Sequence, residues 1–124
     1  MAKRVTESST EQLLKTINES ILEKKGETII NLNLENIENS ITKYFVICSG
    51  TSNIHVNTIA QYIEHNVRNK LKERVWHKEG FENSEWILLD YVDVVVHIFQ
   101  PEARAFYRLE QLWADAKTET IESI

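Results

Sequence analysis

The residues Ser49-Gly50-Thr51-Ser52 have the small side chains and the position of an anion-binding turn. They follow an apolar run and precede a helical pattern, and the free backbone amides at a helix start can hold an anion. The turn lacks the lysine of a GxxxxGKS/T loop and the glycines of a GxGxxG loop. The sequence therefore favours a plain tight turn in which Ser52 caps the following helix.

Cys48 and His55 flank this turn and suggest a thiol–imidazole pair. A cysteine nucleophile needs a nearby base and a third group that orients the base. No third group is evident, and Cys48 lies in an apolar run, where a neutral buried thiol is the usual outcome. The sequence therefore predicts no catalytic residue here. As the chain's one cysteine, Cys48 cannot form an internal disulfide, which fits a reducing compartment.

Asp90, Asp93 and His97 carry donor atoms that a divalent cation could use. They are strung along two successive strand patterns, and three such groups do not converge without a fourth from elsewhere. Aspartate beside a turn is more often a local hydrogen-bond acceptor. The sequence therefore predicts no metal site, and nothing in it indicates a cofactor.

The dipeptide Tyr91-Val92 makes a poor hairpin turn, because two-residue turns favour residues that adopt positive φ and valine is β-branched. A bulge or a longer turn is expected instead. Tyr91 would then project at the end of the sheet, between Asp90 and Asp93, as an exposed interaction residue. A tyrosine in the core fits the sequence about as well.

The strand pattern before this turn is apolar on both faces. Trp86, Leu88 and Asp90 share one face, and Ile87 and Leu89 take the other. A sheet of this kind is covered by helices on both sides or offers one face to a partner. The pattern therefore points to a candidate interaction face.

Hydrophobic spacing predicts the elements that position these residues. A first helix lies between Ser8-Ser9-Thr10 and Lys24-Lys25-Gly26. Alternation over 30–34 predicts a half-buried strand, the run 44–48 predicts a central strand, and a long helix follows over about 53–73.

The second half of the chain continues with strands and a last helix. Residues 75–77 form a possible short strand, and 86–91 and 94–99 are two strong strand patterns. Pro101 suits the first turn of a final helix. Its predicted inward face is Phe106, Leu109, Leu112, Trp113 and Ala116.

The resulting order, α-β-β-α-β-β-β-α, predicts an α/β or α+β fold with a mixed sheet of about five strands packed by helices. No linker, repeat or low-complexity tract divides the chain. A single domain over 1–117 and a short C-terminal tail over 118–124 are therefore expected.

Composition narrows the classes of function. The chain has 124 residues and a net charge of −5, so it is a poor candidate for binding phosphates itself and suits a basic protein partner better. Residues 1–10 contain no apolar signal-peptide core, and the apolar runs 44–48 and 92–99 are too short to span a bilayer. A soluble, cytoplasmic protein is expected.

Three ordered blocks carry a resemblance to a known family. They are CSGTSNIHV at 48–56 with Ile59-Ala60; Glu79-Gly80, WILLDY at 86–91 and DVVVHIF at 93–99; and Glu102 to Arg104, Tyr107, Leu109-Glu110 and Leu112-Trp113. In these blocks the sequence resembles the ribosomal silencing factor family, also called Iojap-like, from about Ser9 to Lys117. It departs at Val92, where many members have glycine.

The resemblance implies a five-stranded fold related to nucleotidyltransferases but without their paired Asp-x-Asp, and hence a binding protein that is not an enzyme. It further implies binding to protein L-fourteen of the large ribosomal subunit, steric exclusion of the small subunit, and repression of translation. A metal- and nucleotide-using transferase, or a factor in large-subunit assembly, is the alternative.

Within that interpretation, we expect the partner-binding residues to be Lys78, Glu79, Trp86, Leu88, Asp90, Tyr91 and Asp93. Little direct contact with nucleic acid and none with membrane is expected, and the free protein is a possible homodimer.

Overall fold

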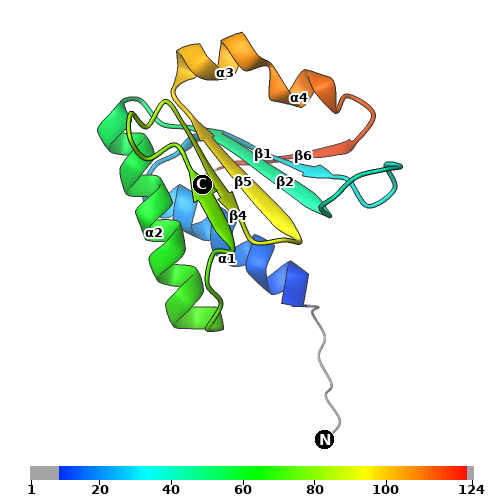
Figure 1. Ribbon diagram of the computed structural model, residues 1–124, viewed down its shortest axis with the longest axis horizontal. Helices are drawn as coiled ribbons and strands as arrows, with labels where there is room; N and C mark the ends of the chain where they lie inside the picture. Colours follow the sequence, from blue (N-terminus) through cyan, green and yellow to red (C-terminus); the bar gives the residue numbers. More distant parts are fainter. Residues whose placement is uncertain (1–8, 123–124) are drawn as a thin grey trace, which may run out of the picture.

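A six-stranded mixed sheet forms the middle of the computed structural model, which describes residues 9–122. The elements are α1 (Ser9–Glu23), β1 (Glu27–Asn33), β2 (Tyr44–Ser49), α2 (Asn53–Leu71), β3 (His77–Glu79), β4 (Trp86–Asp90), β5 (Val94–Phe99), α3 (Pro101–Tyr107), α4 (Leu109–Leu112) and β6 (Lys117–Ile121). The sheet lies between α1 and α2 on one side and α3 and α4 on the other (Figure 1). Ser8, one of the predicted capping residues, and the last two residues of the predicted tail lie outside the described range.

The strand order is β3-β4-β5-β2-β1-β6. The central neighbours β2 and β5 are parallel, with Val46 opposite Val96, and the other neighbouring pairs are antiparallel. A parallel pair needs a long crossover connection, which α2, β3 and β4 supply here. The central strands are nearly continuous runs of buried apolar residues, as expected where both faces of a strand are covered.

The side of the sheet that packs against α1 and α2 holds the larger hydrophobic core. Ile17 and Ile21 of α1 meet Ile59 and Ile63 of α2 over Val96, and all five are fully buried. Each helix places these residues four positions apart, so they form one stripe facing the sheet. We call this side the closed face.

The opposite side is covered by α3 and α4 mainly over β1, β2 and β5, and on β4 only Trp86 packs against this cover. Leu32, Ile47 and Phe99 form a smaller buried cluster there, and Ala103 and Trp113 from the segment above pack against it. Leu88 and Asp90 of β4 belong to neither cluster and are half-buried. This side is therefore closed at the centre of the sheet and open toward the β3–β4 edge.

The prediction of five strands is wrong, because the sheet has six. The sixth, β6, lies mostly within residues 118–124, which were expected to be a tail, and pairs with β1 from Lys117 opposite Asn33 to Ile121 opposite Ile29. Its residues are exposed apart from the half-buried Ile121. Backbone pairing rather than side-chain burial holds β6 in place, so no hydrophobic pattern in the sequence predicts this strand.

The single last helix predicted after Pro101 is also wrong, because the chain breaks it into α3 and α4. Arg108 sits between them in the left-handed region, at φ 49°. The break turns Phe106 and Leu112 outward, where they are 77% and 73% exposed, although the sequence predicted both on the inward face. Among the described residues no helix is long and apolar enough to cross a membrane.

Candidate protein-binding face

Successive side chains of β4 point to opposite sides of the sheet. Ile87 and Leu89 are fully buried in the core of the closed face. Trp86, Leu88 and Asp90 point the other way and remain half-buried. The sequence-based prediction of two different faces on this strand is confirmed.

The edge strand β3 extends the same uncovered surface. His77 pairs with Asp90 and Glu79 with Leu88 across the β3–β4 ladder, and both β3 side chains are exposed. They contact each other through His77 Nε2 and Glu79 Oε2 at 2.6 Å. We call the surface formed by His77, Glu79, Trp86, Leu88 and Asp90 the open face.

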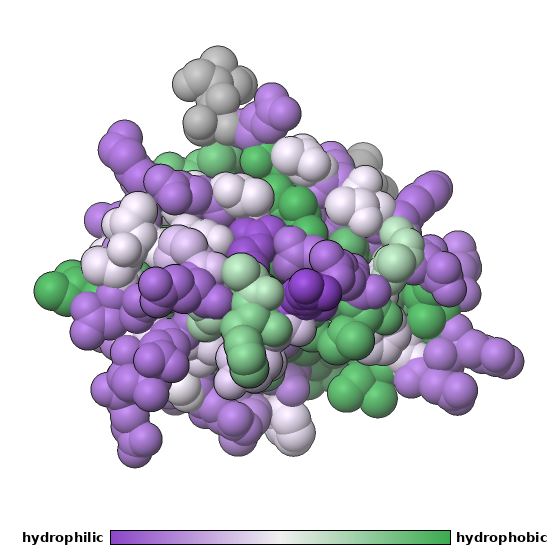
Figure 2. All heavy atoms as spheres, turned by 90° about the horizontal axis from the view of Figure 1, so that it is seen from above, coloured by the Kyte–Doolittle hydropathy of each residue, from purple (hydrophilic) through white to green (hydrophobic). Residues whose placement is uncertain are grey.

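An apolar groove borders the open face where three segments of the chain meet. It has a volume of about 260 Å³ and is lined by Ile41, Thr42, Trp76, Asp90, Val92 and Val95. Ile41 is 93% exposed, Trp76 71% and Val92 56%. Figure 2, which looks onto the α3–α4 side of the molecule, shows a largely polar surface on which apolar residues are exposed in several separate places. Apolar side chains exposed together beside a sheet face mark an interaction site.

The hairpin between β4 and β5 fixes one wall of this groove. The amide of Asp93 donates to the carbonyl of Tyr91 at 2.9 Å, which closes a tight turn around Val92 at φ 77°. Asp90 Oδ1 accepts from the amide of Val92 at 2.8 Å, and Thr42 Oγ1 donates to the Val92 carbonyl at 2.8 Å. A γ-turn of this sign is rare, and a β-branched residue in it is strained. The surrounding hydrogen bonds thus hold an apolar side chain outward at an energetic cost.

The other end of the open face is aromatic. The Trp86 ring stacks on Phe99 at 4.8 Å between centroids and lies against Tyr107 at 4.7 Å. Tyr107, at the end of α3, is 49% exposed. Trp86 therefore joins the buried cluster beneath α3 to the surface.

Trp86 also determines which ring nitrogen of the buried His97 carries the proton. Its indole Nε1 donates to His97 Nδ1 at 3.1 Å. Because an indole N–H can only donate, Nδ1 is the acceptor and the neutral ring carries its proton on Nε2. Burial lowers the pKa of His97 from 6.5 to about 3. Nε2 is buried without a hydrogen-bond partner within residues 9–122.

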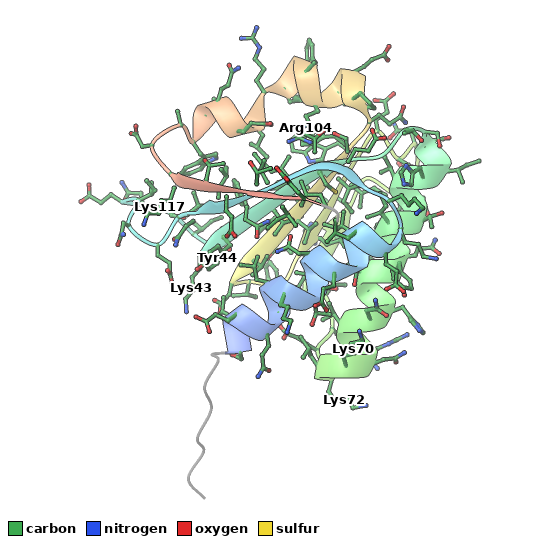
Figure 3. All side chains as sticks on the ribbon, turned by 180° about the vertical axis from the view of Figure 1, so that it is seen from behind. Lys43, Tyr44, Lys70, Lys72, Arg104 and Lys117 are labelled. Carbon is green, nitrogen blue, oxygen red and sulfur yellow. The ribbon has the colours of Figure 1, made fainter. Side chains whose placement is uncertain are left out.

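Arg104 anchors α3 above the sheet. Its Nη1 donates to the carbonyl of Thr28 at 2.8 Å and to Ser49 Oγ at 2.9 Å, and its Nη2 pairs with Glu110 at 3.0 Å. Figure 3 shows Arg104 between α3 and the sheet. The contacts tie the cover of this side to the ends of β1 and β2, so that the uncovered part stays at β3 and β4.

Four of the seven residues predicted to bind a partner lie on the open face: Glu79, Trp86, Leu88 and Asp90. The expectation that Tyr91 projects into solvent is wrong, because it is 3% exposed within the core of the closed face. Burial raises the pKa of its hydroxyl, and Glu64 and Glu73 raise it further. The alternation that places Ile87 and Leu89 inward extends to Tyr91 and could have revealed this.

Lys78 and Asp93 also point away from the open face. Lys78 reaches across the closed side to Glu64 of α2, at 3.1 Å. Asp93 accepts a hydrogen bond from Thr10 Oγ1 of α1 at 2.9 Å and lies 3.8 Å from Lys43. Grouping them with Trp86 on one surface is therefore incorrect.

The Ser49–Ser52 segment is the predicted turn, and Ser52 caps α2 by accepting from the amide of His55 at 3.1 Å. Cys48 and His55 do not form a pair. Burial raises the pKa of Cys48 to about 12. The His55 ring accepts from the amide of Thr51 at 2.8 Å and contacts the carbonyl of Lys24 at 2.8 Å.

Asp90, Asp93 and His97 do not converge, since each has the separate partners given above. In the part of the chain that the structure describes, no three His, Cys, Asp or Glu side chains are grouped so that they could hold a metal ion.

The sequence reasoning missed the groove residues Ile41, Trp76 and Val92. Ile41 is a single apolar residue in a polar connection, Trp76 follows Val75 in a short segment, and Val92 lies in the hairpin turn, so no periodic pattern identifies them as surface residues. The signal that was available is the number of tryptophans: Trp76 stands in a charged segment outside any core stripe.

This geometry can be compared with known proteins. A family model described as "Ribosomal silencing factor during starvation" matches residues 6–124. The chain belongs to this family. The ribosomal silencing factor of Halalkalibacterium halodurans is 36% identical over 116 residues, which cover 94% of this chain and 97% of that protein.

Two further comparisons place this family member among its relatives. The crystal structure of a protein from Chromobacterium violaceum superposes with a TM-score of 0.82 at 28% identity, covering 94% of this chain and 95% of that one. A Mus musculus protein named "Mitochondrial assembly of ribosomal large subunit protein 1" is 36% identical over 74 residues, which cover 58% of this chain and 32% of that protein.

Proposed function

We propose that this ribosomal silencing factor binds the large ribosomal subunit through its protein L-fourteen and thereby blocks the small subunit from joining. The open face with its adjoining groove is the observation that supports this function. It combines exposed apolar side chains with the carboxylates of Glu79 and Asp90 on a rigid sheet. A surface of that kind suits a protein partner that is basic and partly apolar.

The proposed mechanism is occupation of space and needs no reaction step. The residues of the open face are held by strand pairing, and the groove by the hydrogen bonds around Val92 and Thr42. Such a preformed surface loses little conformational freedom when it binds. Once seated on the face of the large subunit that meets the small subunit, the protein excludes the small subunit by its bulk and lowers translation.

A role in large-subunit assembly is the second candidate. The name of the mouse relative favours it, since that protein is described by assembly of the mitochondrial large subunit. The same contact serves both roles, because a factor bound to the joining face of an incomplete subunit also keeps the small subunit away.

The test is a subunit-joining assay with purified subunits and no nucleotide. Wild-type protein is expected to sediment with the large subunit and to prevent formation of the joined ribosome. Trp76→Glu, in the groove, should lose both activities together. Ile54→Glu is the matched control, because Ile54 is 74% exposed against 71% for Trp76, and it lies in the first turn of α2.

Three results would contradict the proposal. They are joining that proceeds normally with wild-type protein bound, a Trp76→Glu variant that binds and blocks like wild type, and blocking that depends on added nucleotide. The last result would favour the enzymatic alternative.

A further inference from the structure

One segment of this acidic chain carries a net positive charge. Residues 65–78 contain five of the 14 lysines and arginines but one of the 19 aspartates and glutamates. The segment therefore carries +4, whereas the remainder of the chain carries −9. Its five basic residues are Arg68, Lys70, Lys72, Arg74 and Lys78, and we call the surface that they form the basic patch.

The fold gathers these residues at one end of the molecule. Arg68 and Lys70 lie in the last turn of α2, Lys72 follows in the left-handed region at φ 58°, and Arg74 lies in the connection to β3. All five residues of the basic patch are exposed. Figure 3 shows Lys70 and Lys72 pointing outward at the end of α2 that is farthest from α3 and α4. Arg68, Arg74 and Lys78 also line a hollow of about 360 Å³, together with Glu64 and Val75.

Little within the protein neutralises this charge. Lys78 pairs with Glu64, but Arg68, Lys70, Lys72 and Arg74 form no ion pair within residues 9–122. Glu73, the one acidic residue of the segment, is half-buried; its pKa is raised first by burial and then by the nearby charge of Asp93. A helix C-terminus favours cations in its last turn, which accounts for Arg68 and Lys70 but not for Arg74 and Lys78 beyond it.

We propose that the basic patch binds the phosphate backbone of ribosomal RNA next to the protein-binding site. This inference rests on the proposed function, since it assumes that the open face docks on the large subunit. Several flexible cations around a hollow suit phosphates, which are bound as charges without base recognition. On a ribosomal subunit RNA supplies most of the negative surface, because ribosomal proteins are largely basic.

The position of β3 makes the two contacts compatible. His77 and Glu79 point to the open face, and Lys78 between them points to the basic patch. A partner seated against the open face therefore leaves the basic patch free at the same edge of the sheet. The expectation of little contact with nucleic acid was based on the net charge of −5 for the whole chain. It did not consider that the charge is unevenly distributed and that residues 65–78 carry +4.

The first test measures binding to purified large subunits over a range of salt concentrations. Lys70→Gln/Lys72→Gln is expected to weaken binding about tenfold at moderate salt. It should also reduce the slope of log affinity against log salt by roughly 1.5, because each phosphate contact contributes about 0.7–0.9. Lys15→Gln/Lys25→Gln is the matched control, since it removes the same charge from exposed positions. Equal affinities and slopes for the two double variants would overturn the proposal.

The second test identifies the partner directly. Lys72→Cys carrying an iron chelate should cleave nearby ribosomal RNA through hydroxyl radicals, and Lys25→Cys with the same label should not. Labelling is site-specific because Cys48 is fully buried. If affinity falls in the Lys70→Gln/Lys72→Gln variant without RNA cleavage from position 72, the patch binds an acidic protein and the RNA assignment is wrong.

Failure of this inference is distinguishable from failure of the proposed function. If the proposed function is wrong, wild-type protein does not bind isolated L-fourteen or block joining. If only the RNA contact is wrong, wild type still does both and the Lys70→Gln/Lys72→Gln variant matches it on intact subunits. If both proposals hold, that variant binds isolated L-fourteen like wild type and loses affinity only for the subunit.

Discussion

The two faces of the sheet differ in what they bury. The closed face is packed by the two long helices α1 and α2, whose inward residues are mostly aliphatic, with Ser20 and Asn66 hydrogen-bonded to each other among them. On the other face, the two short helices cover His97 and the buried side chain of Arg104, which belongs to α3, and they leave β3 and all of β4 except Trp86 uncovered. The comparison indicates that most of the favourable free energy of hydrophobic burial comes from the closed face. The opposite face buries fewer apolar side chains and leaves part of its surface available to a partner.

The polar groups of the second face support this division. Arg104 holds α3 by hydrogen bonds to the ends of two strands, and Trp86 uses its one donor on His97. Such contacts fix positions more than they add stability, because burying a charge or an imidazole costs much of what its partners return. Because these contacts fix the position of α3 and α4, the two helices do not extend over Leu88 and Asp90 of β4, which stay accessible to a partner.

The largest expected effect is a loss of stability when a buried residue of the closed face is truncated. Ile63→Ala removes a fully buried side chain from the closed face and should lower the free energy of unfolding by about 3–4 kcal/mol. Ile54→Ala on the same helix, at an exposed position, should change it by less than about 0.5 kcal/mol. Denaturation with urea measures both. Similar values for the two variants would show that the closed face does not dominate stability.

The next largest effect is a loss of affinity when a residue of the groove beside the open face is truncated. Trp76→Ala should weaken binding to the large subunit by about 2 kcal/mol, or roughly 30-fold, because exposed tryptophans beside apolar grooves are frequent hot spots. Its melting temperature should stay close to that of wild type, since the side chain is 71% exposed. Sedimentation over a range of protein concentrations measures the affinity. A variant that loses stability and affinity in parallel would refute the assignment of Trp76 to the interface.

The closed face was largely predictable from the sequence, and the open face only in part. Ile17, Ile21, Ile59 and Ile63 repeat with helical spacing, and this periodicity reports directly on burial. Periodicity also placed Trp86 and Leu88 opposite Ile87. The same rule, carried two residues further, would have placed Tyr91 correctly.

The remaining features depend on interactions that leave no periodic trace. Strand β6 is held by backbone hydrogen bonds to β1, and Arg108 adopts the left-handed region without being a glycine or an asparagine. Trp76 and Ile41 become neighbours of Val92 only when the connections before β2 and β3 fold against the hairpin. Contacts between distant loops of this kind are set by the tertiary structure, so local patterns do not predict them.

A pH-dependent effect tests the buried imidazole of the second face. His97 has its pKa lowered to about 3 by burial, whereas in the unfolded chain it binds a proton near pH 6.5. The unfolded state therefore binds more protons as the pH falls below 6.5. The free energy of unfolding should consequently decrease, by up to about 1.4 kcal/mol per pH unit, while above pH 7.5 this contribution is constant.

Urea denaturation between pH 7.5 and 5 measures this dependence, in a range above most carboxylate titration. His97→Gln removes the imidazole while offering Trp86 an amide oxygen as acceptor. The variant should lose the part of the pH dependence that belongs to His97. The same slope in wild type and His97→Gln would mean that another group is responsible.

The smallest effect concerns Val92, where stability and binding are expected to change in opposite directions. Its φ of 77° is unfavourable for a β-branched residue, and glycine adopts this region freely. Val92→Gly should therefore raise the free energy of unfolding by about 1 kcal/mol, after the entropic cost of glycine is subtracted. The same change removes an exposed apolar side chain from the groove and should weaken binding to the large subunit by about 0.5–1 kcal/mol.

Val92→Ala serves as the control, because it shortens the side chain but keeps the strained backbone, so it should weaken binding without the gain in stability. If Val92→Gly is destabilised like a core variant, or binds more tightly than wild type, the hairpin does not hold Val92 outward for the benefit of the interface.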